Sequence, residues 1–209
     1  MRIMIADDHT VFREGLKRIL AEATDISEVG EASNAQQLLE RISERHWDLV
    51  LLDISMPGKG GVEVLKEIKQ TNPRLAVLVL SMHPERQFAV RVIKAGAAGY
   101  LTKGAAASEV LQAIRRVYRY GKYISDNVAE QLAMAVGQKT DRPLHERLSD
   151  REFEVLRMIG AGKTVGEIAE ELSLSVKTVS TYRTHILEKM NLKNNAELML
   201  YAVTNGLLE

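Results

Sequence analysis

Short apolar runs alternate with amphipathic stretches along the first 120 residues of the chain. An apolar run bounded by polar residues is typical of a strand buried on both faces, and apolar residues spaced three and four apart predict a helix. The predicted strands are Arg2–Ala6, Ser27–Ala32, Asp48–Leu52, Leu75–Leu80 and Gly99–Leu101, and the predicted helices are Val11–Glu22, Ala35–Glu44, Gly61–Thr71, Glu85–Ala95 and Ala106–Tyr118.

Strict alternation of strands and helices predicts a parallel sheet covered by helices on both faces. Five strand–helix units suit the flavodoxin-like strand order 2-1-3-4-5. After these units a helix is predicted at Asp126–Val136, and the polar segment Gly137–Arg147 is typical of a linker. We therefore expect an α/β domain at 1–120, a helical and flexible linker at 121–147 and an all-α domain at 148–209.

Four helices are predicted in the C-terminal part of the chain. Residues 149–152 and 164–167 each fit the capping box, in which side chains bond the free amides of the first turn of a helix. A third helix is expected from Ser175 to Met190, and a fourth at Ala196–Thr204. No strand pattern interrupts them, so this part is expected to be entirely helical.

Composition excludes several kinds of site. The chain has 28 Lys and Arg against 28 Asp and Glu, so its net charge favours neither nucleic acid nor a membrane as partner. The absence of cysteine excludes disulfides, thiolate zinc sites and a cysteine nucleophile. No segment has the length and apolar character of a membrane span, and the N-terminus lacks the apolar core of a signal peptide. We expect a cytoplasmic protein with no membrane partner.

Polar side chains gather where the predicted strands end. Asp7 and Asp8 follow the first strand, and Asp53 follows the third, which is the neighbour of the first in the predicted order. Ser81 ends the fourth strand and Lys103 follows the fifth. Ligands of such sheets bind at the carboxyl ends of the strands. Because three carboxylates repel one another at close range, an all-oxygen site of this kind suits Mg²⁺.

Such a site indicates phosphoryl transfer to a carboxylate. A carboxylate acts as a nucleophile and carries a phosphoryl group in several classes of protein, and Asp53 is the candidate here. Lys103, Ser81 and Mg²⁺ would neutralise and orient the phosphoryl oxygens. Taken singly, Asp7 and Asp8 could instead cap a helix, and Lys103 could be a solvated charge.

The N-terminal part resembles the receiver domain of two-component response regulators. The resemblance rests on the five residues just named and on the turn Met56-Pro57-Gly58 that follows Asp53. It implies that Asp53 accepts a phosphoryl group from a sensor histidine kinase or a phosphotransfer protein. It also implies Mg²⁺ held by Asp8, Asp53 and the backbone carbonyl of Ser55, with Asp7 acting mainly through water.

The same resemblance implies a switch pair. Ser81 and Tyr100 match a hydroxyl that moves to the phosphoryl group and an aromatic side chain that turns inward. A core tyrosine is the alternative interpretation of Tyr100. Gly104 departs from the family pattern, because many receivers have proline after the lysine, but this leaves the expected role of Lys103 unchanged.

The predicted helices at 164–172 and 176–190 have the spacing of a helix-turn-helix, whose second helix enters the major groove. Residues 148–209 contain seven Lys and Arg against nine Asp and Glu, so total charge does not support DNA binding. Charge distribution does, because Val176–Lys193 has a net charge of +3. A plain helical bundle with a solvated basic face is the alternative.

Periodicity divides the second of these helices into two sides. Val176, Val179, Ile186 and Met190, with Leu187 beside them, are expected to pack inward. Short polar side chains suit base edges, and the remaining polar ones suit phosphates. The expected base-facing residues are Ser180, Thr181 and Thr184, and the expected phosphate-facing residues are Lys177, Thr178, Tyr182, Arg183 and Lys189.

Residues 148–192 resemble the output domain of NarL/FixJ (LuxR-type) response regulators. The resemblance implies a homodimer on double-stranded promoter DNA, with Asn195–Leu207 as a dimer contact. We therefore interpret the chain as a phosphorylation-dependent transcriptional regulator that acts on no external substrate. We also hypothesise that the unphosphorylated receiver, through the linker, covers or misplaces the helix at 176–190.

Two other functions are kept as alternatives. The first is a phosphorylation-independent DNA-binding protein whose receiver is only a dimerisation module. The second is a phosphatase that forms an aspartyl-phosphate, which needs a general acid near the nucleophile. Ser55, two residues after Asp53, is not a second acid, and this argues against the phosphatase.

Overall fold

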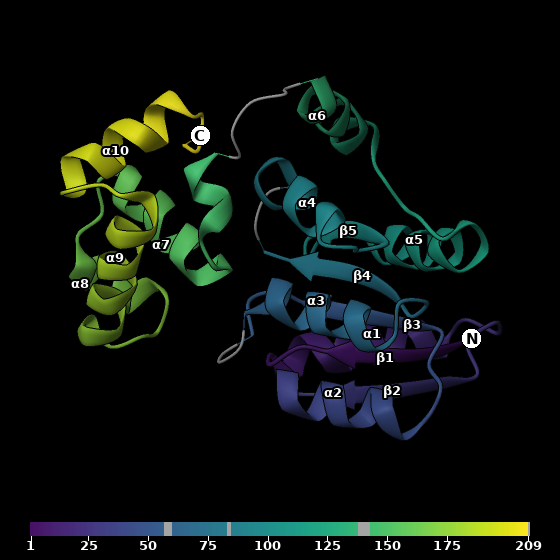
Figure 1. The fold of residues 1–209 in the computed structure, drawn as a ribbon. Helices are drawn as coiled ribbons and strands as arrows, with labels where there is room; N and C mark the ends of the chain where they lie inside the picture. The colour runs from purple at the N-terminus through teal and green to yellow at the C-terminus, as the bar shows by residue number, and fades with distance from the viewer. Residues whose placement is uncertain (57–59, 83–84, 138–142, 209) are drawn as a thin grey trace. The chain divides into compact units, whose positions relative to one another are not determined.

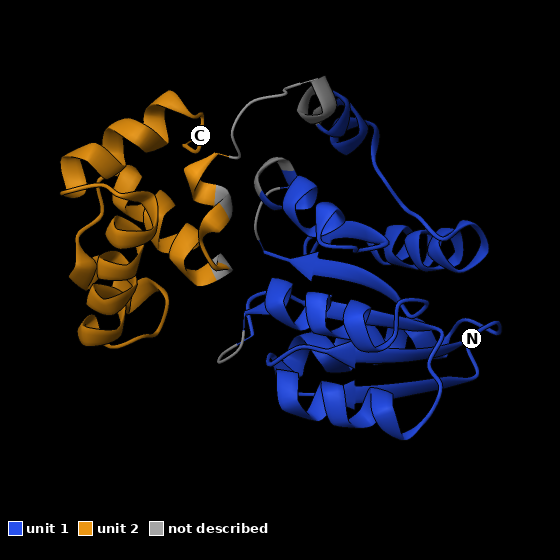
Figure 2. Ribbon diagram, viewed as in Figure 1, with its two compact units in different colours: residues 1–139 blue, residues 140–209 orange. Residues whose placement is uncertain are grey.

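The computed structural model describes residues 1–56, 60–82, 85–137 and 143–208. It divides into two compact units, residues 1–139 and residues 140–209 (Figure 2). Pro57 and Gly58 of the predicted turn, and residues 138–142 of the predicted linker, lie outside the described residues.

Five parallel strands form the sheet of the N-terminal unit, in the order β2-β1-β3-β4-β5 (Figure 1). This confirms the predicted fold class and strand order. The strands are β1 (Arg2–Ala6), β2 (Glu28–Ala32), β3 (Leu49–Asp53), β4 (Ala76–Ser81) and β5 (Gly99–Thr102). The helices of this unit are α1 (Thr10–Ala21), α2 (Ala35–Glu44), α3 (Gly61–Thr71), α4 (Glu85–Lys94), α5 (Ala107–Tyr120) and α6 (Asp126–Gly137).

Alternating side chains divide the core between the two faces of the sheet. Ile3, Ile5, Leu49 and Leu51 pack with residues of α1 and α5 in one buried cluster. Residues of the opposite parity, such as Met4, point to the other face, and α2 and α3 contact each other in this unit. Since both faces are covered, every position of β3 is buried, which is why its sequence is a continuous apolar run.

β1 and β2 end where predicted, whereas β3, β4 and β5 each reach one residue further toward the candidate site. Asp53 is the last residue of β3 and pairs in register with Leu80. Ser81 is the last residue of β4 and pairs with Thr102 of β5. The sheet ladder therefore fixes the backbone of both polar residues, which a loop would leave free.

The C-terminal unit is helical, as predicted. Its first two α-helices begin with the predicted capping boxes, in which Ser149 exchanges hydrogen bonds with Glu152 and Thr164 with Glu167. α9 contacts both α7 and α8, and α10 contacts α7. The elements are the 3₁₀ helix η1 (Leu144–Arg147) and the α-helices α7 (Asp150–Gly160), α8 (Val165–Glu171), α9 (Val176–Met190) and α10 (Asn195–Thr204).

One predicted core position of α9 is wrong. Val179, Ile186 and Met190 are buried and Leu187 is partly buried, but Val176 is 57% exposed. At 100° per residue the three buried side chains lie within an arc of about 40°, whereas Val176 lies about 60° from Val179. Val176 is also the first residue of α9, so it precedes all three buried side chains in the helix.

None of the helices within the described ranges combines the length and the apolar character that crossing a membrane requires.

Substitution of Gly61 is expected to destabilise the N-terminal unit. A Cβ at Gly61 would lie 2.3 Å from Cα of Ile54, so backbone must move, and we expect Gly61→Ala to cost about 1–3 kcal/mol. Gly15→Ala is the matched control, because nothing lies within 4 Å of a Cβ there, and it should be neutral or stabilise by about 0.5–1 kcal/mol. The single tryptophan, Trp47, is buried in this unit and reports urea unfolding by its fluorescence. Equal midpoints for both variants would contradict the packing described here.

Candidate functional site

The carboxyl ends of β1 and β3 bring three aspartates together. One oxygen or nitrogen each of Asp7, Asp8, His9 and Asp53 lies within 4.8 Å of the others. Asp7 and Asp53 are 1% exposed, while the side chain of Asp8 is 30% exposed. The cluster therefore has two buried carboxylates and a third that faces solvent.

Lys103 lies between the two buried carboxylates. Its Nζ is 2.7 Å from Oδ2 of Asp7 and 2.8 Å from Oδ2 of Asp53. Its amide donates to the carbonyl oxygen of Ser81 (2.7 Å), which anchors the turn after β5 to β4. The ammonium also lies 4.8 Å from the ring centroid of Phe12, a cation–π distance. One buried cation thus compensates two buried anions.

Burial and neighbouring charges shift the pKa values of Asp53 and Lys103 in opposite directions. Burial raises the pKa of Asp53 above its usual value, although Lys103 and the Ser55 amide oppose the rise. For Lys103, burial lowers the pKa, but the two carboxylates outweigh it and the net shift is upward. Lys103 is therefore charged at neutral pH, and it holds Asp53 in a site that otherwise disfavours the anion.

The remaining predicted residues of the N-terminal unit lie around Asp53. The Ser55 amide donates to Oδ1 of Asp53 at 2.8 Å. Ser81 is fully buried, and its side chain hydrogen-bonds to the hydroxyl of Tyr100, which is 2% exposed. Burial raises the pKa of Tyr100 to about 12, so the phenol stays neutral. Tyr100 is thus a buried residue in contact with Ser81, a position compatible with both interpretations made from the sequence.

Two residues of this site were missed in the sequence. Nδ1 of His9 lies 3.1 Å from Oδ1 of Asp7 and 3.0 Å from Oδ1 of Asp8, and its amide donates to Asp7. Arg13, one turn later in α1, donates to the carbonyl oxygen of Asp7 at 2.7 Å. The available signal was position, because His9 directly follows the acidic pair and opens the helix. Asp7 thereby also orders the start of α1.

The buried carboxylate oxygens of Asp7 and Asp8 are candidate ligands of a divalent cation. Oδ2 of Asp7 lies 2.7 Å from Nζ of Lys103, and Oδ1 of Asp8 lies 3.0 Å from Nδ1 of His9. Both are carboxylate oxygens, the ligands that Mg²⁺ prefers, whereas the imidazole of His9 suits softer metals. The residues present therefore fit a hard divalent cation at the edge of the sheet.

The first residue of α4 connects the switch region to α6. Oε1 of Glu85 accepts a hydrogen bond from the Ser125 hydroxyl (2.7 Å), and Oε2 lies 3.5 Å from Nδ2 of Asn127. Tyr123, just before α6, forms a bridge with Gly99 at the start of β5. Glu85 also acts electrostatically on Tyr100. The beginning of α6 is therefore attached both to α4 and to β5.

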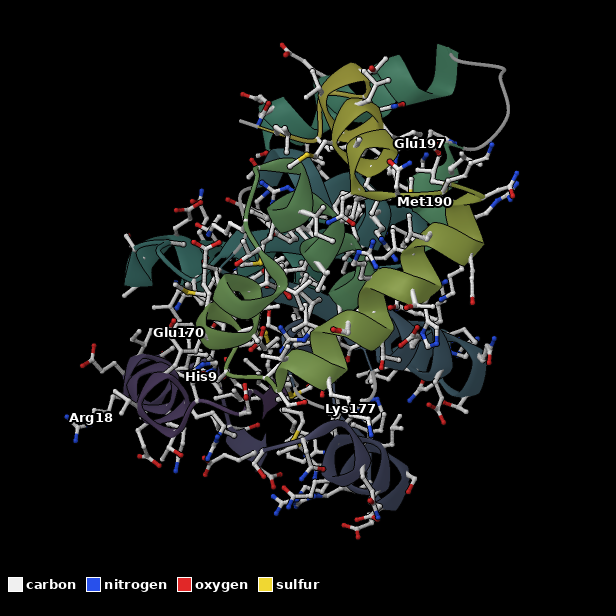
Figure 3. The ribbon with its side chains drawn as sticks, turned by 90° about the vertical axis from the view of Figure 1, so that its left-hand side faces the viewer. His9, Arg18, Glu170, Lys177, Met190 and Glu197 are labelled. Carbon is white, nitrogen blue, oxygen red and sulfur yellow. The ribbon has the colours of Figure 1, made fainter. Side chains whose placement is uncertain are left out.

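The predicted DNA-facing residues lie on α9, which Figure 3 shows from Lys177, in its first turn, to Met190, its last residue. Ser180, Thr181 and Thr184 are exposed, but the hydroxyls of Thr181 and Thr184 donate to carbonyl oxygens one turn earlier, at 3.0 and 3.1 Å. Their methyl groups remain available to a partner. Lys177 is exposed, and Tyr182 and Arg183 are partly exposed.

Three of the predicted phosphate-facing side chains already have partners within the unit. Nζ of Lys189 lies 2.7 Å from a carboxylate oxygen of Glu152, which is 2% exposed. Arg183 donates to Oδ1 of Asn195 at 2.5 Å, and Thr178 bonds the hydroxyl of Ser175 that caps α9. Lys189 thus holds α9 to α7 by compensating the buried charge of Glu152. The sequence pattern of α9 alone does not reveal this role.

Comparisons with known proteins were made for both units. The family model "Response regulator receiver domain" matches residues 3–115, and the model "Bacterial regulatory proteins, luxR family" matches residues 146–202. The response regulator UvrY of Escherichia coli (strain K12) is 39% identical over 209 residues, covering 99% of this chain and 95% of the relative. The response regulator GacA of Pseudomonas viridiflava is 38% identical, covering 100% and 98%.

A solved structure gives the same match over the whole chain. RcsB from Salmonella enterica serovar Typhimurium, bound to promoter rprA in the presence of the phosphomimetic BeF3−, aligns with a TM-score of 0.61 and 28% identity. The alignment covers 96% of this chain and 97% of the RcsB chain. Both units are therefore shared with that protein.

Loss of the Lys189 ammonium is expected to destabilise the C-terminal unit. Burial raises the pKa of Glu152, but hydrogen bonds from Lys189 and Ser149 outweigh it, so its pKa lies below the usual value. Lys189→Met leaves the buried carboxylate uncompensated, at a cost of about 1–2 kcal/mol because Lys189 itself is partly solvated. Since the folded pKa is lowered, this contribution is present above about pH 4.5 and is lost as Glu152 protonates. Hydrogen exchange of the α7 and α9 amides measures it.

Lys177→Met is the matched control on the same helix. Its side chain is exposed, so its effect on stability should stay within about 0.5 kcal/mol. Equal protection of the amides in both variants at neutral pH would contradict the role given to Lys189.

Proposed function

The chain belongs to the response regulators that carry a luxR-family output domain, and on this premise we propose that Asp53 is its phosphoacceptor and α9 its DNA-recognition helix. It is a transcription regulator that receives its phosphoryl group from a kinase, and it is not an enzyme with an external substrate. The observation that carries the assignment of Asp53 is its burial beside Lys103 in a cluster of carboxylates.

In the proposed reaction, an oxygen of the Asp53 carboxylate attacks phosphorus in the partner's phosphohistidine. The P–O bond forms as the P–N bond breaks, and the imidazole nitrogen leaves with the electron pair. Burial makes the carboxylate poorly solvated, which favours its use as a nucleophile. Lys103, now 2.8 Å from that carboxylate, is placed to donate to the phosphoryl oxygens.

We further propose that Mg²⁺ binds through Asp8, Asp53 and the Ser55 carbonyl, with Asp7 acting mainly through water. The clustered carboxylates and the buried oxygens of Asp7 and Asp8 support this. When bound, the cation supplies positive charge that stabilises the transferred phosphoryl group. Kinase partners and promoter DNA share one compartment, so we place the protein in the cytoplasm.

The proposed switch begins at Ser81 and Tyr100. A phosphoryl group adds negative charge beside Lys103 and gives the Ser81 hydroxyl a stronger acceptor than the phenol of Tyr100. Breaking that hydrogen bond changes the electrostatic environment of the Tyr100 phenol and, through Tyr100, that of Glu85. Because Glu85 holds the start of α6 through Ser125, the change reaches the segment that precedes the output domain.

The proposed DNA complex is a homodimer on promoter DNA. RcsB has been solved bound to promoter rprA, and as two dimers bound to two parallel DNAs. In this chain α9 carries exposed Lys177 and a row of short polar side chains. Leu200 and Val203 of α10 are 67% and 63% exposed, and we assign them to the dimer contact expected at Asn195–Leu207.

We retain the receiver at 1–120, the linker at 121–147 and the output domain at 148–209. α6 falls within this linker, and its attachment to Glu85 supports a linker that responds to the receiver. The family models match residues 3–115 and 146–202, and most of the proposed linker falls outside both matches, which supports these bounds.

Phosphorylation at Asp53 is tested by intact mass. After incubation with Mg²⁺ and a small acyl-phosphate donor, we expect one added phosphoryl group in the native protein and none in Asp53→Asn. Asp48→Asn is a control, because Asp48 lies before β3, at the end of the strand opposite to Asp53, and its side chain accepts a hydrogen bond from the Arg2 amide. An adduct that persists in Asp53→Asn would overturn the assignment. The absence of any adduct, with no rapid hydrolysis of the donor, would favour the phosphorylation-independent alternative.

DNA recognition is tested by two substitutions in α9. Lys177→Ala should weaken binding to all duplexes and lower the salt slope by about one, because it removes one phosphate contact. Thr184→Ala should change sequence preference at one position by about 1–3 kcal/mol and leave the slope unchanged. Selection from a random duplex pool followed by salt titration measures both. If the two variants affected every sequence and the slope alike, this division of roles would be wrong.

A further inference from the structure

A cavity of about 640 Å³ lies in the N-terminal unit, away from the aspartate cluster. It is bordered by the segments that precede β3, β4 and β5, by the end of α3 and by the turn after α5, all of which can be followed in Figure 1. These segments lie at the amino ends of the strands, whereas Asp53 lies at a carboxyl end. Volumes of about 300–1,000 Å³ are typical of small-molecule sites.

Positive charge dominates the wall of this cavity. Lys69, Lys122 and Arg74 line it, with His46 beside them. The carboxylate in the wall is Asp48, and its Oδ2 accepts a hydrogen bond from the Arg2 amide at 2.7 Å. The wall therefore has more cationic side chains than carboxylates, and the Asp48 carboxylate already accepts a hydrogen bond.

Lys69 is held in place along its whole side chain. Its stem lies over Gly96, where a Cβ would come within 3.1 Å of Cγ of Lys69, and Gly96 has a φ of +107° that favours glycine. Its Nζ donates to the carbonyl oxygen of Leu75 at 2.6 Å, with that of Pro73 at 3.5 Å. The ammonium is thus directed to a fixed point at the cavity.

Lys122 approaches from another element. It follows Gly121, the left-handed residue that ends α5, and its Nζ donates to the carbonyl oxygen of Ala97 at 2.6 Å. The two ammonium groups repel each other, and burial together with this repulsion lowers the pKa of Lys69. Burial also lowers the pKa of Lys122.

Carbonyl contacts alone do not account for this arrangement. A carbonyl oxygen satisfies one ammonium hydrogen but does not neutralise the charge, and Lys122 retains two further donors. Within the described residues, neither Lys69 nor Lys122 forms an ion pair with a carboxylate. Lys122 is exposed and Lys69 is partly buried, and their repulsion acts on the more buried Lys69. A bound anion would relieve this repulsion.

We propose that this cavity, defined by Lys69, Lys122 and Arg74, binds a small molecule through a phosphate or diphosphate group. A phosphate offers several charged oxygens to the ammonium donors and the Arg74 guanidinium, which suits their number and spread over three elements. Tyr118, which is 55% exposed, lines the same cavity and offers an apolar surface to an organic part of the ligand.

Calorimetric titration with pyrophosphate, in buffer without divalent cations, tests the site on the full chain. We expect saturable binding at one site, weakened about tenfold or more by Lys69→Gln and by Lys122→Gln, since each removes a charged hydrogen bond. Lys69→Arg should retain most of the affinity. Lys66→Gln is the matched control, because Lys66 lies one turn earlier on α3, is exposed and is not part of the cavity wall.

Several results would overturn the proposal. They are the absence of saturable binding, equal affinity in the native protein and both glutamine variants, or a loss of affinity only in Lys177→Gln of the output domain.

Titration with ADP identifies the source of the phosphate: tighter binding that Tyr118→Ala abolishes indicates a nucleotide, and equal binding indicates the diphosphate itself. Phosphorylation of Asp53 in Lys69→Gln serves as the folding control, so failure here leaves the proposed function standing.

Discussion

The N-terminal unit depends on one ammonium group shared by two buried carboxylates. Lys103 lies 2.7 Å from Asp7 and 2.8 Å from Asp53, and both aspartates are almost inaccessible to solvent. Removing one partner from a buried charge pair typically costs about 3–5 kcal/mol, so the cluster is costly unless its charges stay balanced. The balance explains why Asp53 ends a fully buried strand. It also explains why we expect an added phosphoryl group to have structural consequences, because the phosphoryl oxygens would compete with Asp7 and Asp53 for Lys103.

The path from this cluster to the linker consists of short, identifiable contacts. Ser81 bonds the phenol of Tyr100, Glu85 interacts electrostatically with that phenol, and the Ser125 hydroxyl bonds Glu85 at 2.7 Å. Each step is a polar contact that a change of charge at Asp53 can alter. The proposed switch pair is thereby connected to α6 through α4, and the proposed coupling needs no large rearrangement of the sheet.

The sequence predicted most of what depends on local pattern. The strand order, both capping boxes and the grouping of acidic residues at strand ends follow from apolar periodicity and from topology rules. The errors concern contacts between elements. Val176 is expected on the buried side of α9, but it lies outside the arc of the buried side chains and is exposed.

Contacts made across the chain also explain the residues that were missed or given another role. Lys189 belongs to the basic stripe by sequence, but its partner Glu152 is 37 residues away on α7. His9 carries no periodic signal, and the contacts of its imidazole with Asp7 and Asp8 become visible only in the folded structure. Lys69 and Lys122 lie far apart in the sequence and converge on one cavity only in the folded sheet. Patterns within one element cannot report such pairs.

We propose that a charge change at Asp53 controls DNA binding by the output domain. The most direct test is the affinity of the full chain for a duplex selected with the phosphorylated protein, measured at fixed salt before and after phosphorylation, with Asp53→Asn in parallel. We expect tighter binding after phosphorylation, and no change for Asp53→Asn under the same treatment. Equal affinity of the phosphorylated and unphosphorylated protein would contradict it, and would make the receiver a dimerisation module without a switch.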